Sequence, residues 1–110
     1  MEQVPHLRAI NPAQINIPNI SQSMRVNSGQ LLFLSGHVPL GPDGTVAGPT
    51  LEAQLEQVFQ NMNATLQAAG TTFADVARLT LYVRDLEADD VALIRAVRDR
   101  YINATCPPAP

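Results

Sequence analysis

The side chains that could do chemistry are few and are widely spaced along the chain. Ser35, Gly36 and His37 follow an apolar run, and Cys106 is the only cysteine. A histidine can serve as a general base at neutral pH, but in a loop His37 is better interpreted as bonding that loop. Ser35, at the end of a predicted strand, is likewise interpreted as a hydrogen-bond partner of the loop that follows. Cys106 has no nearby run of cations that would activate its thiol, so a small buried apolar role is favoured.

The charged residues suggest surfaces rather than a catalytic cluster. Arg78 and Arg84 are interpreted as surface or subunit-interface charges, with the alternative that one of them clamps a ligand of a neighbouring chain. Glu52 and Glu56 are spaced i, i+4 and are expected to form a solvated helix face. Two histidines and one cysteine have no metal-ligand spacing, so we predict no metal site and no cofactor.

Composition predicts one small domain over residues 1–110. The chain is 45% hydrophobic and has enough apolar surface for one core. It has no lysine, a formal charge of -3 and few aromatic residues, which argues against nucleic acid as a partner. A single cysteine, no secretory leader pattern and no apolar run near the roughly 20 residues of a membrane span predict a cytoplasmic protein without a membrane partner.

The first half of the chain predicts strands, a long loop and a helix. Residues 6–10 are expected to form an edge strand, and residues 23–26 and 31–35 a β-hairpin whose apolar second arm is a central strand covered on both faces. Residues 36–49 are rich in Gly and Pro and predict an ordered loop with its tightest turn at residues 42–44. A helix is expected from an N-cap at Thr50 to a left-handed Gly70.

The second half predicts a turn at residues 73–75, a half-buried strand and a second helix. Residues 76–84 alternate between apolar and polar side chains, as a strand with one buried face does. Residues 87–101 begin with acidic and end with basic side chains, which complements a helix dipole. The predicted order is β-β-β-α-β-α, an α/β (α+β) fold with both helices on one face of a sheet and a second subunit covering the other face.

Several segments resemble the RidA/YjgF family, which is also called the endoribonuclease L-PSP family. The resemblance lies in residues 35–40, 42–44, 53–62, 66–70, 75–86 and 101–107, and it is collinear over roughly residues 19–108. It implies a chorismate-mutase-like fold, a homotrimer whose sheets form a barrel, and ligand clefts between subunits. Relatives continue for about two more strands, so the 110 residues are expected to lack the last strands of the family fold.

The same resemblance implies hydrolysis of small imines or enamines to oxo acids and ammonia, although three family positions differ here. The family's carboxylate-binding Arg corresponds to Ala109, its Tyr to Ile20 and its Asn to Leu93, and its water-positioning Glu lies beyond Pro110. This places the chain in an Arg-less branch. The candidate cleft residues are Ser35, Gly36, His37, Leu93, Cys106, Pro107 and Ala109, with Arg78 or Arg84 as a substitute clamp.

Three functions follow as hypotheses. The first is a homotrimer whose clefts take a small imino, enamino or oxo acid. The alternative is a trimer that binds small molecules without turnover or acts as a chaperone. An endoribonuclease is the third, and the acidic charge and scarce aromatic residues argue against it.

Overall fold

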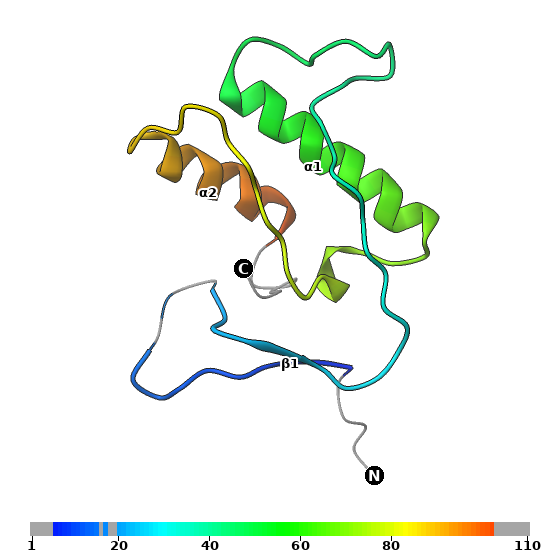
Figure 1. Cartoon of the computed structure of the whole chain (residues 1–110), viewed down its shortest axis with the longest axis vertical. Helices are drawn as coiled ribbons and strands as arrows, with labels where there is room; N and C mark the ends of the chain where they lie inside the picture. Colours follow the sequence, from blue (N-terminus) through cyan, green and yellow to red (C-terminus); the bar gives the residue numbers. More distant parts are fainter. Residues whose placement is uncertain (1–5, 16, 18–19, 103–110) are drawn as a thin grey trace.

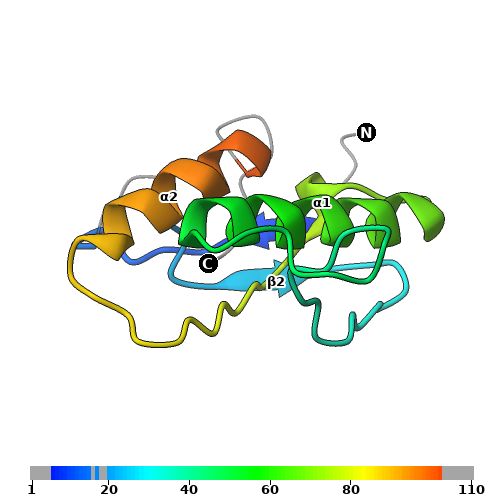
Figure 2. The same ribbon diagram turned by 90° about the horizontal axis from the view of Figure 1, so that it is seen from above.

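The computed structural model describes residues 6–15, 17 and 20–102. The element order is β1 (Leu7–Ala9), β2 (Met24–Val26), α1 (Leu51–Ala68), the 3₁₀ helix η1 (Phe73–Asp75) and α2 (Asp90–Tyr101). The two helices lie side by side in one layer, and the β1–β2 ribbon lies below them (Figures 1 and 2). The α+β class predicted from the sequence is confirmed.

Helix α1 begins and ends where its sequence predicts. The Thr50 side chain accepts a hydrogen bond of 3.1 Å from the Ala53 backbone N–H and so caps the first turn. After the last turn Gly70 has φ 76°, a left-handed conformation that favours glycine. The face buried against the rest of the protein consists of Leu55, Phe59, Met62 and Leu66.

An aromatic cluster joins the two helices to η1. The Phe59 ring stacks on Tyr101 of α2 with 5.1 Å between ring centroids, and it contacts Phe73 of η1 at 6.0 Å. Phe59 and Val97 are fully buried, so α1 meets α2 and η1 at the centre of the core.

A polar clamp lies at the edge of this cluster. Arg100 of α2 donates to Glu52 at 2.9 Å and to Glu56 at 3.0 Å, and the Tyr101 hydroxyl donates to Glu56. The Tyr101 bond lowers the pKa of Glu56, whereas burial raises the pKa of Tyr101. Glu52 is exposed, as expected of a solvated face, and the sequence did not reveal that an arginine of α2, 44 to 48 residues further along, bridges both carboxylates.

The predicted hairpin between residues 23–26 and 31–35 is wrong. Strand β2 pairs instead with β1, antiparallel, with Arg8 opposite Arg25. The ribbon is extended at both ends by Ile10 N–H to Ser23 C=O at 3.1 Å and Asn27 N–H to His6 C=O at 2.7 Å. The predicted edge strand, β1, thus pairs with β2 in place of residues 31–35. After β2, the turn through Gly29, which has φ 97°, leads the chain away from the ribbon.

Residues 31–35 are extended but belong to no strand, which corrects the expectation of a central strand covered on both faces. Leu31 is 68% exposed and Phe33 is 87% exposed. Only Leu34 of this segment packs against the core. The segment has the apolar composition of a buried strand, but the described part of the chain does not bury it.

Residues 76–84 keep the predicted alternation but also belong to no strand. Leu79 and Leu81 pack against the core, whereas Tyr82 is 95% exposed. The apolar face therefore lies on the helices as predicted, but within residues 6–15, 17 and 20–102 no ladder of backbone hydrogen bonds pairs this segment with a neighbour. The predicted turn at residues 73–75 is confirmed as η1, and the second helix begins at Asp90 rather than at Glu87.

The loop over residues 36–49 is ordered around its predicted turn. Gly41 N–H donates to the Thr45 C=O at 2.9 Å, and Gly44 N–H donates to the Gly41 C=O at 2.9 Å. The Asp43 carboxylate accepts from the Thr45 backbone and hydroxyl, which lowers its pKa. In the described part of the chain, neither helix is long and apolar enough to cross a membrane.

Truncating the central ring tests this core. We expect Phe59→Ala to lower the free energy of unfolding by about 3–5 kcal/mol, since it removes a fully buried ring that three elements share. Urea titration followed by circular dichroism measures the change. Gln67→Ala, an exposed change on the same helix, should cost less than about 0.5 kcal/mol, and equal losses for the two variants would contradict this view of the core.

Candidate functional site

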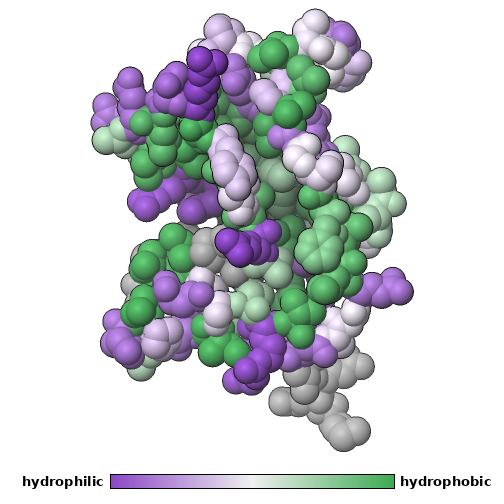
Figure 3. All heavy atoms as spheres, in the orientation of Figure 1, coloured by the Kyte–Doolittle hydropathy of each residue, from purple (hydrophilic) through white to green (hydrophobic). Residues whose placement is uncertain are grey.

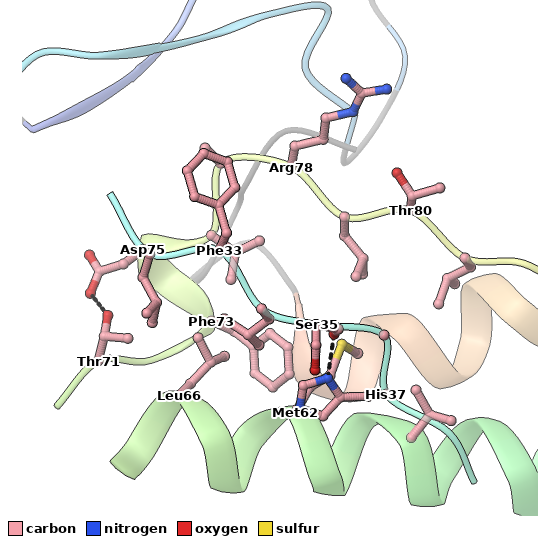
Figure 4. A pocket seen from close by; sticks show the side chains of 18 of the residues that line it. Phe33, Ser35, His37, Met62, Leu66, Thr71, Phe73, Asp75, Arg78 and Thr80 are labelled. Atoms are coloured by element: carbon pink, nitrogen blue, oxygen red, sulfur yellow. Dashed lines mark hydrogen bonds between the residues drawn. The ribbon is translucent and has the colours of Figure 1, made fainter. Parts of the chain in front are cut away.

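A large open groove runs between the two extended segments. It encloses about 1500 Å³. Its walls are residues 30–39 and 76–84, and its apolar floor includes Leu55, Met62 and Phe73. Hydrophobic side chains also gather on the face of the molecule seen in Figure 3. Figure 4 shows side chains from both segments and from α1 around the groove.

The Ser35–Gly36 turn lies at the lower wall of the groove, as Figure 4 shows for Ser35. Both residues are exposed. No atom lies within 4 Å of the position that a Gly36 side chain would take, so the space beside the turn is open. This open space leaves the backbone of Ser35 and Gly36 accessible from the groove.

His37 ties this turn to helix α1. Its Nδ1 lies 2.8 Å from the Ser35 carbonyl oxygen, and its Nε2 lies 2.8 Å from the Thr65 hydroxyl. A carbonyl only accepts, so Nδ1 carries the proton. The Thr65 hydroxyl can then donate to Nε2, or it can turn to the Asn61 carbonyl 3.2 Å away and accept from a protonated ring. Both ring nitrogens are engaged, which supports the loop-bonding interpretation over that of a catalytic base.

Asn61 makes the second connection between loop and helix, and sequence reasoning missed it. Its side-chain amide donates to the Val38 carbonyl at 3.0 Å and to the Leu40 carbonyl at 2.9 Å. Asn61 and Thr65 are one turn apart on α1, so together they hold residues 37–40 against the helix. The sequence indicated only that Asn61 lies on the polar side of an amphipathic helix. That pattern does not show which loop packs against this side.

The two candidate clamp arginines differ in their surroundings. Arg84 pairs with Asp85 at 3.5 Å, and both side chains are at least 90% exposed. Arg78 also lines the groove, and within the described residues it has no carboxylate partner. Figure 4 shows Arg78 pointing away from Ser35. Within one chain, the Arg78 guanidinium is therefore not directed at Ser35.

The remaining candidates are not brought to the groove. Leu93 belongs to α2 and packs against the core. Neither Leu93 nor Ile20 lines the groove. Cys106, Pro107 and Ala109 lie outside the described residues, so their placement in a cleft stays a prediction. The described residues contain no group of three His, Cys, Asp or Glu side chains that could hold a metal ion.

A hydrogen-bonded cluster at the rim of the groove was also missed. The Asp75 carboxylate lies 2.6 Å from His6 Nε2 and accepts from the Thr71 hydroxyl. The Thr71 bond, and then the His6 bond, lower the pKa of Asp75. Thr71 bonds to the carboxylate and not to the imidazole, so no activated nucleophile results. The cluster joins the start of the β-ribbon to η1. His6 and Asp75 are 69 positions apart in the sequence, so no local pattern predicted their contact.

The Asp75 cluster should make stability depend on pH. The folded-state pKa of Asp75 lies below the ordinary 3.8, so the ionised carboxylate stabilises the fold fully above pH 3.8. This stabilisation is lost as the pH falls from there through the lower folded-state pKa. At pH 7 we expect Asp75→Asn to cost about 1 kcal/mol, allowing for solvent screening, and the cost to shrink below pH 4. Urea titrations from pH 3 to 7 measure it. A pH-independent cost, or the same profile in the exposed control Asp85→Asn, would refute the assignment.

The His37–Thr65 bond should appear as a coupling energy. A double-mutant cycle with His37→Ala and Thr65→Val should give about 0.5–1.5 kcal/mol of coupling in the free energy of unfolding, the usual range for one hydrogen bond. Replacing Thr65→Val by Thr80→Val, on the other wall of the groove, should give additive effects. Additivity in the first cycle would show that the 2.8 Å contact does not hold the loop.

Comparison with known proteins identifies the family. The family model described as endoribonuclease L-PSP matches residues 14–110. The chain is 40% identical over 91 residues to protein DfrA of Myxococcus xanthus, covering 81% of this chain and 66% of DfrA. It is 31% identical over 85 residues to a 2-iminobutanoate/2-iminopropanoate deaminase of Salmonella typhimurium, covering 74% of this chain and 65% of that enzyme. The chain thus spans about two thirds of the length of these relatives.

A solved structure agrees with the sequence matches. The crystal structure of YyfB from Yersinia pestis, a Rid-family protein of unknown function, superposes with a TM-score of 0.84 at 32% identity. The superposition covers 96% of this chain and 82% of YyfB. The chain therefore belongs to the endoribonuclease L-PSP family, also called the RidA/YjgF or Rid family.

Proposed function

We propose that this protein acts as a homotrimer with a chorismate-mutase-like fold, in which clefts between subunits take a small imino, enamino or oxo acid. Family membership and the similarity to an iminopropanoate deaminase support the substrate class. The observation that carries the proposal is Arg78, a groove-lining cation without a carboxylate partner in the described part of the chain. It points away from its own Ser35, so it can serve a ligand held at the turn of a neighbouring copy (Figure 4).

In this proposal, Arg78 of one copy and the Ser35–Gly36 turn of the adjacent copy bind opposite ends of a small acid. The planar guanidinium of Arg78 donates two parallel hydrogen bonds to the carboxylate. The open Ser35–Gly36 turn of the adjacent copy contacts the imine end, where the exposed Ser35 hydroxyl can bond to nitrogen or to water. Arg78 thereby replaces the family arginine whose position is Ala109 here.

The reaction proposed is hydrolysis of the C=N bond. Water adds to the imine carbon and one of its protons goes to the nitrogen, which gives a carbinolamine. The hydroxyl proton then passes to the nitrogen as the C=O bond forms and the C–N bond breaks, which leaves an oxo acid and ammonia. His37 is not the base in this scheme, since its ring nitrogens are engaged by Ser35 and Thr65. The cleft therefore supplies binding and orientation.

That same engagement of His37 favours a second candidate function, a trimer that binds the small acid without turning it over. With His37 engaged, the Ser35–Gly36–His37 segment offers no free imidazole to activate water. A chaperone-like role belongs to this alternative too, and cytoplasmic location remains a prediction.

Ammonia release separates the two functions. We expect the protein to accelerate ammonia release from freshly generated 2-iminopropanoate above the buffer rate, and Arg78→Gln to raise KM about tenfold or more, as loss of a charge-assisted bond predicts. Arg95→Gln, an exposed change outside the groove, should leave KM unchanged. Absence of turnover, with a pyruvate-induced thermal shift that Arg78→Gln abolishes, would leave the binding function in place of the enzyme.

The oligomeric state of the protein in solution tests the proposed homotrimer. Sedimentation should show a species of three 11.9 kDa chains. A monomer at micromolar concentration would contradict the intersubunit clefts, and with them the role of Arg78.

A further inference from the structure

The loop over residues 36–49 carries a dipeptide with a chemistry of its own. Asp43–Gly44 is the only place in these 110 residues where Asp or Asn directly precedes glycine. Because glycine has no Cβ, its backbone nitrogen can closely approach the side-chain carboxyl carbon of the preceding residue. Such a pair can close a succinimide ring and rearrange to isoaspartate. Residues 43–45 are exposed, so burial does not keep water away from this dipeptide.

The rearrangement needs no reactant other than water. The Gly44 nitrogen attacks Cγ of the protonated Asp43 carboxyl, the N–Cγ bond forms, and the amide proton leaves with the carboxyl hydroxyl as water. A second water then adds to one of the two ring carbonyls and breaks its bond to the Gly44 nitrogen. Opening at Cγ restores aspartate. Opening at the backbone carbonyl leaves isoaspartate, whose main chain runs through Cβ and Cγ.

Hydrogen bonds occupy both reacting groups in this structure. The Gly44 N–H donates to the Gly41 C=O at 2.9 Å. Oδ1 of Asp43 accepts from the Thr45 backbone N–H at 3.0 Å and from the Thr45 hydroxyl at 2.8 Å. The backbone bond, and then the hydroxyl bond, lower the pKa of Asp43, so less of the carboxyl is in the protonated form that is attacked. Ring closure therefore has to break these bonds first.

The backbone on both sides of the dipeptide is also fixed. The Gly41 N–H donates to the Thr45 C=O at 2.9 Å, which closes the turn around Asp43. One residue further out, Leu40 and Val46 form an antiparallel bridge. These contacts restrict the rotation that would bring Cγ of Asp43 onto the next backbone nitrogen.

We propose that Asp43–Gly44 is a site of spontaneous isomerisation to isoaspartate, and that the Thr45 hydroxyl protects it by binding the Asp43 carboxylate. Isomerisation lengthens the main chain of the turn by one carbon and removes the side-chain carboxylate that Thr45 binds. Residues 40–46 are then no longer held as a turn, whereas helix α1 is unaffected. This inference does not depend on the imine chemistry, since it uses only the contacts within the turn.

The rate of isoaspartate formation tests the proposal. The unprotected reference is the acetylated and amidated peptide Gly-Pro-Asp-Gly-Thr-Val, which has the sequence of residues 41–46. Both are incubated at mildly acidic pH, and the isoaspartate fraction is measured by chromatography and mass spectrometry, after proteolysis of the protein. The intact protein should react at least about tenfold more slowly than the peptide, because several hydrogen bonds must break. Equal rates would overturn the proposal.

Variants of Thr45 separate its hydroxyl from the rest of the turn. Thr45→Val should raise the rate about 2- to 10-fold, the factor expected for one hydrogen bond, whereas Thr45→Ser keeps the hydroxyl and should react as the unchanged protein does. Asp43→Glu should form no isoaspartate in this segment, which locates the signal. A Thr45→Val rate equal to that of the unchanged protein, or a Thr45→Ser rate equal to that of Thr45→Val, would refute protection by the hydroxyl.

Hydrogen exchange checks the structural consequence. In the isomerised protein, the amides of Gly41, Gly44 and Thr45 should exchange faster, since their bonds within the turn are lost, and the amides of α1 should not change. Unchanged exchange in the turn would show that these contacts do not depend on the Asp43 carboxylate and would contradict the proposal.

Discussion

The stacking of Phe59 on Tyr101, beside Phe73, is the contact on which the rest of this structure depends. Each ring comes from a different element, so the contact sets the position of α1, α2 and η1 relative to one another. The Arg100 clamp then aligns the two helices, because one guanidinium bridges carboxylates one turn apart on α1. The floor of the groove belongs to this helical layer, and both extended walls contact it.

The helical layer also positions the loop over residues 36–49 and the two extended segments. Residues 37–40 are held on α1 by Thr65 and Asn61, which places the Ser35–Gly36 turn at the wall of the groove. Residues 76–81 lay their apolar face on the same helices. Within the described residues, neither residues 31–34 nor residues 77–83 take part in a backbone hydrogen bond, so the helices position these two segments through side chains alone.

The local elements were predictable where short-range chemistry decides them. The Thr50 cap, the left-handed Gly70 and the turn around Asp43 each depend on a few adjacent residues and were found as expected. The hairpin was predicted wrongly, because the apolar run at residues 31–35 signals burial but not which strand lies beside it. His6–Asp75 and Arg100–Glu52 could not be predicted, since they join residues 69 and 48 positions apart.

The sequence by itself determined the helices, their apolar faces and the family, because side-chain periodicity and collinear motifs are properties of the chain alone. Only the tertiary structure decided that His37 is bound to Thr65 and that Arg78 points away from Ser35. It alone also decided that residues 31–35 and 76–84 lie apart across a groove. The physical reason is that pairing and contact depend on which elements meet in space, and an alternating pattern is the same whether or not a neighbouring strand is present.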